Sequence, residues 1–279
     1  MEQCIQKIED LTLSNGIFDT VADCTYVLLC CGPKPAREYN VRHQLPILSP
    51  TTRVKLIYNS GCNTCILTKC PQEDMARAQL YIFQDALKNN YRRILILEDD
   101  FMVLQPIPHA DVHQIVTFIR ENDPSAYGLG NFSIPTVSSL FAYHQRLVGN
   151  YLGAAHAVFY NRDFMTQTVK YYDDNGMGDM LMNDQLTSKL PLVENYRYYK
   201  PLVYQTFPLT ENQISGWSHT IPAFLMPLVT GSIRMMKLDR QVDPGYTILY
   251  NIPYVLYMVL IIVILVVIYY VLNGKLPRR

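Results

Sequence analysis

Three acidic residues in a row, Glu98, Asp99 and Asp100, are the part of this sequence best suited to chemistry. They directly follow the aliphatic run 94–97. Such a run predicts a strand buried on both faces, as in a parallel sheet covered by helices. Ligands of such folds bind outside the carboxyl ends of the strands. Because neighbouring carboxylates repel one another, the triplet predicts a site for a hard divalent cation. An ordinary polar turn after a strand is the alternative.

Alternation along an extended backbone divides the triplet between two faces. Alternate residues of a strand share a face, so Glu98 and Asp100 can converge while Asp99 points elsewhere. We therefore expect Glu98 and Asp100 to bind a hard divalent cation, and the metal in turn to hold a phosphorylated ligand.

The sequence on both sides of the triplet resembles family-25-type glycosyltransferases. This group contains lipooligosaccharide and procollagen galactosyltransferases, with relatives encoded by large DNA viruses. The resemblance covers roughly residues 24–217. It is carried by GCNTC (61–65), YRRILILEDDF (91–101), GAAHAVFY (153–160), NDQ (183–185) and KPLVYQ (200–205).

The resemblance implies an enzyme of GT-A-type fold. It would move a hexose, with inversion, from a nucleotide-sugar donor such as a UDP-hexose to a hydroxyl of a glycan, protein or lipid acceptor. The resemblance implies a site with the general base Asp184 and the donor contacts Asp99, Arg37 and Arg93. The implied metal is Mn²⁺ or Mg²⁺, with the ligands Glu98, Asp100 and His219.

Several of these residues also have ordinary structural interpretations. Asp184 suits a helix N-cap, and exposed arginines commonly only solvate a surface. We interpret His156, in an apolar strand, as a core residue. The cysteines at 62, 65 and 70 offer three ligands where a structural zinc site needs four, so we expect free thiols.

Two other function classes stay open. The segment 32–35 (GPKP) departs from the pattern of the resembled family, so the fold could serve a membrane protein that binds without turnover. An Mg²⁺-dependent phosphoryl enzyme is the second, but such enzymes need an aspartate after the first strand, where this chain has Cys30 and Cys31.

The elements that must position these residues alternate between strands and helices. This order predicts an α/β fold with a mixed, mainly parallel sheet flanked by helices. We expect strands at 25–31, 54–58, 94–97 and 154–160, and helices at 37–45, 71–87, 111–121 and 163–172.

The end of the chain predicts a transmembrane helix. Residues 252–272 carry no charge, and a helix of this length spans the roughly 30 Å of a bilayer core. Tyrosines near both ends of this run fit interfacial aromatic belts. The expected organisation is an N-terminal extension (1–20), a transferase domain (21–222), a juxtamembrane connector (223–251), the membrane helix (252–272) and a short basic tail (273–279).

Composition limits the partners and the compartment. The chain has 24 basic and 24 acidic residues, and this balance argues against a nucleic-acid partner. Seven cysteines, an odd number, suit a reducing compartment better than a disulfide framework. We therefore expect a single-pass protein whose domain faces the cytosol, with a lumenal domain as the alternative.

Overall fold

The computed structural model of the chain describes residues 4–29, 35–61, 65, 67–68, 71–153, 155–176, 190–191, 193–206, 226–238 and 242–272. Its centre is an eight-stranded sheet in the order β1-β3-β2-β4-β8-β6-β9-β7. Strands β2, β3, β4, β6 and β9 run one way, and β1, β7 and β8 run the other. The sheet is therefore mixed and mainly parallel, as predicted.

The strands of the large sheet are β1 (Ile5–Thr12), β2 (Cys24–Leu29), β3 (Arg53–Asn59), β4 (Arg93–Glu98), β6 (Ala126–Gly128), β7 (His144–Arg146), β8 (Ala157–Asn161) and β9 (Asn195–Tyr198). A second, two-stranded sheet pairs β5 (Phe101–Met102) with β10 (Tyr204–Gln205). The helices are α1 (Pro35–Leu48), α2 (Pro71–Lys88), α3 (His109–Asn122), α4 (Arg162–Asn175), α7 (Met226–Met235) and α8 (Gly245–Leu272), with 3₁₀ turns η2 (Val137–Ser139) and η3 (Val148–Asn150).

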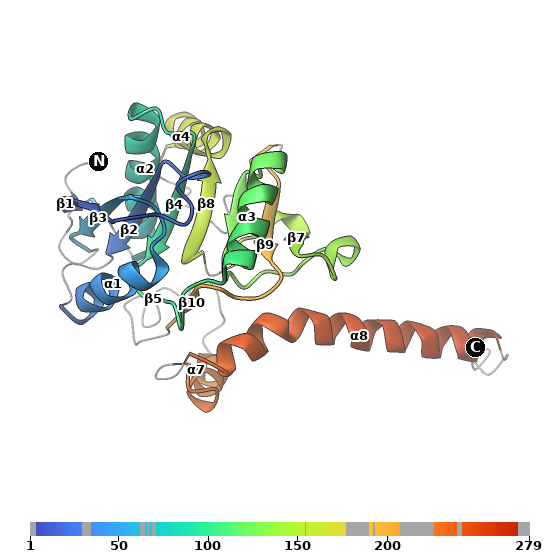
Figure 1. Ribbon diagram of the computed structural model, residues 1–279. Helices are drawn as coiled ribbons and strands as arrows, with labels where there is room; N and C mark the ends of the chain where they lie inside the picture. Colours follow the sequence, from blue (N-terminus) through green and yellow to red (C-terminus); the bar gives the residue numbers. More distant parts are fainter. Residues whose placement is uncertain are drawn as a thin grey trace.

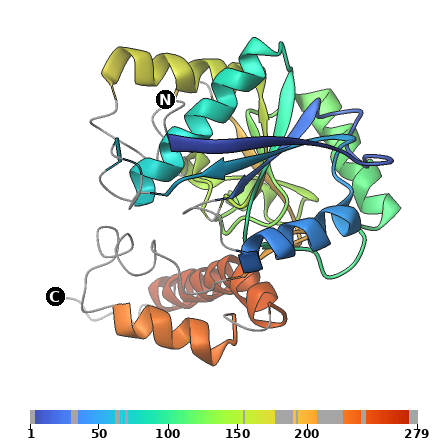
Figure 2. The same cartoon turned by 90° about the vertical axis from the view of Figure 1, so that its left-hand side faces the viewer.

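Helices cover both faces of the large sheet (Figures 1 and 2). Leu95 and Leu97 of β4 pack in the core under α1 and α3, while Ile94 and Ile96 pack in the core under α2 and α4. Each of the four is fully buried. The aliphatic run before the triplet is therefore a strand buried on both faces, as its sequence predicts.

The N-terminal segment, which we expected as an extension, contributes a strand to the sheet. Residues 5–12 form β1, which pairs antiparallel with β3 at the edge of the sheet. Most side chains of β1 are exposed or half-buried, because an edge strand here covers little of the core. Its sequence therefore has few of the apolar residues that identify a strand.

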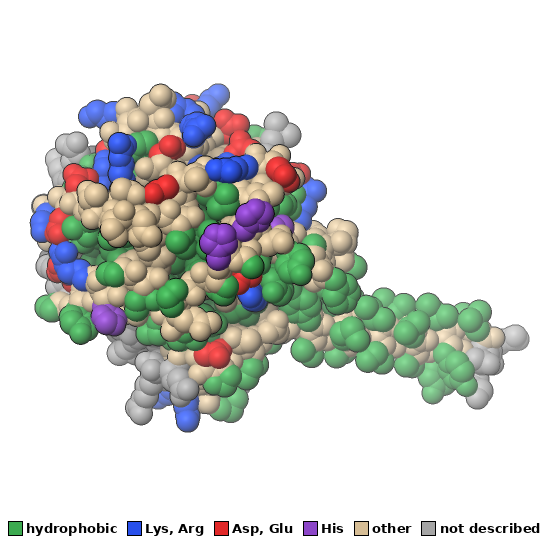
Figure 3. Space-filling view, viewed as in Figure 1, with side chains coloured by type: hydrophobic (Ala, Val, Ile, Leu, Met, Phe, Trp, Pro, Cys, Tyr) green, Lys and Arg blue, Asp and Glu red, His purple; other side chains and the backbone are tan. Residues whose placement is uncertain are grey.

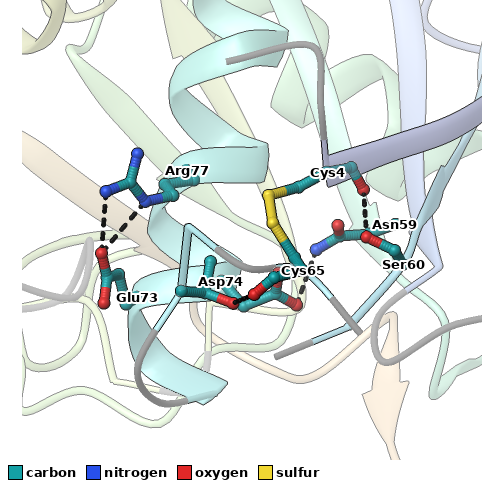
Figure 4. Close-up of a disulfide and its surroundings, with 8 residues drawn as sticks. Cys4, Asn59, Ser60, Cys65, Glu73, Asp74 and Arg77 are labelled. Carbon is teal, nitrogen blue, oxygen red and sulfur yellow. Dashed lines mark hydrogen bonds and ion pairs between the residues drawn. A yellow bond between two sulfur atoms is a disulfide. The ribbon is translucent and has the colours of Figure 1, made fainter. Parts of the chain in front are cut away.

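A disulfide joins this edge strand to the loop after β3. Cys4, immediately before β1, is bonded to Cys65, and Figure 4 shows the pair beside the start of α2. The neighbouring Ser60 hydroxyl donates to the Cys4 carbonyl oxygen, at 2.8 Å. For Cys65 the expectation of a free thiol is therefore wrong. Sequence separation hid the pairing, since the two cysteines are 61 positions apart in the chain.

The C-terminal helix α8 is 28 residues long and projects from the domain like a rod (Figure 1). It is the one helix in the described part of the chain that is long and apolar enough to cross a membrane. Its first turns are packed in the domain, where Tyr246 and Tyr250 are fully buried. Leu238 and Val242 complete this small core, so part of the expected connector is built into the domain.

Candidate functional site

The acidic triplet lies where β4 ends, and Asp99 points from it toward α1. An Arg37 Nη1 atom donates to Asp99 Oδ1 at 2.6 Å, and the two side chains are only 14% and 3% exposed. The Asn40 amide donates to the carbonyl oxygen of Phe101 at 3.0 Å. Helix α1 therefore fixes the outer side of the turn through a nearly buried ion pair and a backbone contact.

Asp100 points to a different partner, on β10. Its Oδ2 accepts a hydrogen bond from Gln205 Nε2 at 3.1 Å. The backbone N–H of Thr206 donates to the Asp100 carbonyl oxygen at 2.9 Å, just beyond the pairing of β5 with β10. The turn is thus held by α1 on one side and by β10 on the other. Asp99 and Asp100 therefore point to different partners, Arg37 on α1 and Gln205 on β10.

Two buried acceptor oxygens at this turn have no donor among the described residues. They are Asp100 Oδ1 and Gln205 Oε1. Burial and the charge of Asp99 raise the pKa of Asp100 above its usual range. A buried acceptor without a donor costs about 1–3 kcal/mol, and a carboxylate costs more. A hard cation is the kind of ligand that such oxygens fit.

Glu98 is connected through its backbone to the base of α8. Its N–H donates to the carbonyl oxygen of His156 at 2.9 Å. His156 Nε2 lies 3.0 Å from the carbonyl oxygen of Val203 and 3.4 Å from the Tyr246 hydroxyl. His156 is fully buried, which confirms its interpretation as a core residue. The same contacts place the start of α8 near the carboxyl end of β4, where the triplet lies.

The expected donor contacts are divided between the two ends of β4. Arg37 lies at the triplet, but Arg93 is the first residue of the strand and contacts Asp123. At about 3.3 Å per residue the length of β4 separates Arg93 from the triplet. A cavity of about 380 Å³ lies at the Arg93 end, where four arginines are offset by four aspartates. Arg93 is therefore not part of the site at the triplet.

The other expected site residues lie outside the described residues. Asp184 and His219 both fall there, so their roles stay predictions. Within the described ranges, no three His, Cys, Asp or Glu side chains come together as a group that could hold a metal ion. The carboxylates of Glu98 and Asp100 would thus need further ligands, from Gln205, from a bound phosphate or from the rest of the chain.

Two residues of the site were missed in the sequence. Asn40 lies on an expected helix, and Gln205 ends the KPLVYQ stretch, but neither amide marks itself as functional in isolation. Gln205 is 105 residues from Asp100, and only the pairing of β10 with β5 brings them together. The signal available was the position of Gln205 in a stretch that carries the family resemblance.

Comparisons with known proteins leave the family open. No protein-family model and no curated protein matches the chain. Among solved structures, a glycosyltransferase involved in the glycosylation of the major capsid of PBCV-1 is 13% identical, with a TM-score of 0.39, over 71% of this chain and all of that one. Apo-UDP-glucose pyrophosphorylase is 8% identical, with a TM-score of 0.38, over 76% of this chain and 85% of that one.

A protein from STIV is 11% identical, with a TM-score of 0.37, over 67% of this chain and 86% of that one. Likenesses at this level support no inference about function. The functional interpretation therefore depends on the residues at the end of β4.

Proposed function

We propose that this protein is a membrane-anchored glycosyltransferase of GT-A type that moves a hexose from a nucleotide-sugar donor to a hydroxyl acceptor. The observation that carries the proposal is the pair of buried oxygens, Asp100 Oδ1 and Gln205 Oε1, that have no donor at the carboxyl end of β4. The resemblance of the surrounding sequence to family-25-type enzymes supplies the reaction class. The donor that we expect is a UDP-hexose.

The metal of the proposal is Mn²⁺ or Mg²⁺, held by Glu98 and Asp100 with the amide oxygen of Gln205. When bound, such an ion offsets the carboxylate charges and stabilises the negative charge that develops on a leaving diphosphate. The set of oxygen ligands fits a hard cation. His219 is the proposed further ligand.

The protein side chains hold this site in one arrangement. Arg37 neutralises Asp99 and prevents it from turning toward Asp100, while Asn40 and Thr206 fix the backbone on either side. We assign Asp99 a contact with the donor's ribose or sugar. Asp184 is the proposed general base that takes the proton of the acceptor hydroxyl.

A turnover assay tests the reaction class. The full chain, in detergent, is incubated with a panel of UDP-hexoses in Mn²⁺ or in EDTA, and release of UDP is measured. We expect release with one donor, loss of release in EDTA, and loss in the Asp100→Asn variant. Glu121→Gln, which changes an exposed carboxylate on α3, is the matched control and should keep full activity.

The outcomes separate the two function classes. If the protein bound the donor but neither released UDP nor transferred sugar to any member of a broad acceptor panel, it would be a binding protein with the same site and not an enzyme. Equal release in Mn²⁺ and EDTA would refute the metal. Absence of donor binding in Mn²⁺ would refute the proposed site itself.

The disulfide bears on which side of the membrane holds the domain. Disulfides persist in oxidising compartments, so the Cys4–Cys65 bond favours the lumenal alternative over the cytosolic expectation. Alkylation of the unreduced, denatured protein tests the bond, because Cys4 and Cys65 should stay unmodified. Protease protection in sealed vesicles tests the topology directly. Alkylation of both cysteines and digestion of the domain from the cytosolic side would restore the cytosolic expectation.

A further inference from the structure

Four tyrosines on one side of α8 attach it to the domain. Tyr246, Tyr250, Tyr254 and Tyr257 follow one another at intervals of three or four residues, which places them on one face of a helix. We call them the tyrosine face. Each hydroxyl has a partner in the domain: Gly130 O at 2.6 Å, Tyr198 O, Gln145 Nε2 and Pro135 O at 2.8 Å, in the order of the helix.

The last of these contacts reaches well along the helix. Tyr257 is the thirteenth residue of α8, and its partner Pro135 belongs to the segment 134–143, which we call the apolar loop. In Figure 1 the chain next to β7 lies beside the first half of α8. The domain therefore still contacts α8 at Tyr257, inside the run of residues 252–272 that would cross the membrane.

The apolar part of α8 that lies beyond the last domain contact is too short for a full span. From Met258 to Leu272 the helix has about 15 residues, or roughly 22 Å, whereas a bilayer core is about 30 Å thick. Tilting the helix would shorten its reach across the membrane further. The sequence continues with Asn273, Gly274 and Lys275, which do not extend the apolar run. About 8 Å of the bilayer core is thus left at the level of the apolar loop.

The side chains of the apolar loop suit that environment. Residues 134–143 contain no charged residue. Ile134, Val137 and Phe141 are 50%, 67% and 89% exposed. In Figure 3 the hydrophobic surface of α8 continues onto the adjoining part of the domain. Interfacial elements with an apolar face commonly sit 5–10 Å deep at the boundary of head groups and acyl chains, which is the depth that the helix length requires.

Hydrogen bonds hold the backbone of the apolar loop in place, so its apolar side chains stay on the surface. The Thr136 N–H donates to the Arg146 carbonyl oxygen at 2.7 Å, and the Val148 N–H donates to that of Ile134 at 2.9 Å. Gln145 Nε2 contacts the Leu140 carbonyl oxygen at 2.8 Å as well as the Tyr254 hydroxyl. One amide thus ties the loop to the helix.

We propose that the apolar loop inserts into the bilayer beside α8, as a second membrane contact whose occupant is lipid acyl chain. The inference rests on the membrane anchor of the proposed function and goes beyond it. Two contacts, a spanning helix and a shallow loop joined by the tyrosine face, fix the rotation of the domain about the helix axis. The carboxyl end of β4, with Asp99 and Asp100, then has a fixed orientation relative to the membrane surface.

Tryptophan quenching by brominated lipids tests the insertion. The full chain is reconstituted into phosphatidylcholine vesicles with bromine near the top or at the middle of the acyl chains. Three variants are compared: Phe141→Trp in the loop, Ile264→Trp in the free part of α8, and Ile8→Trp on β1, at the opposite edge of the sheet from β7. Because the chain has one tryptophan, the emission of the unsubstituted protein is subtracted from each.

We expect shallow bromines to quench the Phe141→Trp variant, deep bromines to quench Ile264→Trp, and neither to quench Ile8→Trp. Quenching of Ile264→Trp without quenching of Phe141→Trp would overturn the inserted loop and leave the anchor intact. Quenching of neither would overturn the anchor as well. If Phe141→Trp emission instead changed with protein concentration and not with lipid bromination, a second copy of the chain would be the occupant and the proposal would fail. Val137→Trp repeats the test at a second exposed position.

Discussion

Two regions near the end of the sheet where β4 finishes both bury polar groups, but only one of them gives every such group a hydrogen-bond partner. In the tyrosine face every hydroxyl has a hydrogen-bond partner in the domain. In the turn after β4, the described residues offer no donor to Asp100 Oδ1 or Gln205 Oε1. Buried polar groups in folded proteins are normally paired. The paired region is explained by attachment of α8, whereas the unpaired oxygens are the atoms that the proposed cation would bind.

Breaking the buried ion pair between Arg37 and Asp99 should cause the largest loss of folding stability. Arg37→Met removes the cation from Asp99, which is 2% exposed, and should lower the free energy of unfolding by about 3–5 kcal/mol. Urea unfolding in detergent with EDTA measures it. Arg42→Met on the same helix is the control, because its exposed ion pairs should contribute no more than about 1 kcal/mol. Equal losses in the two variants would show that Asp99 does not depend on Arg37.

Removing one hydroxyl of the tyrosine face should cause a smaller loss of folding stability. Tyr246→Phe keeps the ring but leaves the buried carbonyl oxygen of Gly130 without its donor, so the free energy of unfolding should fall by about 1–3 kcal/mol. The same urea titration detects the change. Tyr39→Phe, on an exposed tyrosine of α1, should have no measurable effect. An unchanged Tyr246→Phe protein would mean that the tyrosine face does not hold the helix.

The smallest effect should have the opposite sign. In EDTA, Asp100→Asn removes a charge whose Oδ1 has no described donor, so stability should stay unchanged or rise by about 1 kcal/mol. Thermal unfolding measures the shift. Asp111→Asn is the contrast, because Asp111 accepts from Tyr198 at 2.7 Å and pairs with Lys200 at 2.9 Å. Equal destabilisation by both substitutions would contradict the difference between paired and unpaired carboxylates.

Local patterns in the sequence predicted most of the fold. The expected strands at 25–31, 54–58 and 94–97 correspond to β2, β3 and β4, and the expected helices to α1, α2, α3 and α4. The three strands have apolar runs, and α2, α3 and α4 have an apolar face, both of which local sequence reports well. Strand β1 was missed because an edge strand needs few apolar residues.

The site was only partly predictable for a different reason. The position of the triplet after a buried run identified it in the sequence. Arg37 was expected to contact the donor, and the structure places it against Asp99. Gln205 and the tyrosine face depend on contacts between residues that are 52 to 122 positions apart, which a single sequence does not reveal. The placement of Arg93 could have been corrected from the sequence, because it begins the strand that the triplet ends.

Direct binding of Mn²⁺ to the donor-free protein is the decisive measurement. Isothermal titration of the full chain in detergent should show one Mn²⁺ bound. Asp100→Asn should weaken its affinity at least about 100-fold, since even outer contacts of metal sites change affinity 10- to 100-fold. Glu121→Gln should bind as the unsubstituted chain does. Equal Mn²⁺ affinity in Asp100→Asn and the unsubstituted protein would contradict the account, because the unpaired oxygen of Asp100 would then not be a metal ligand.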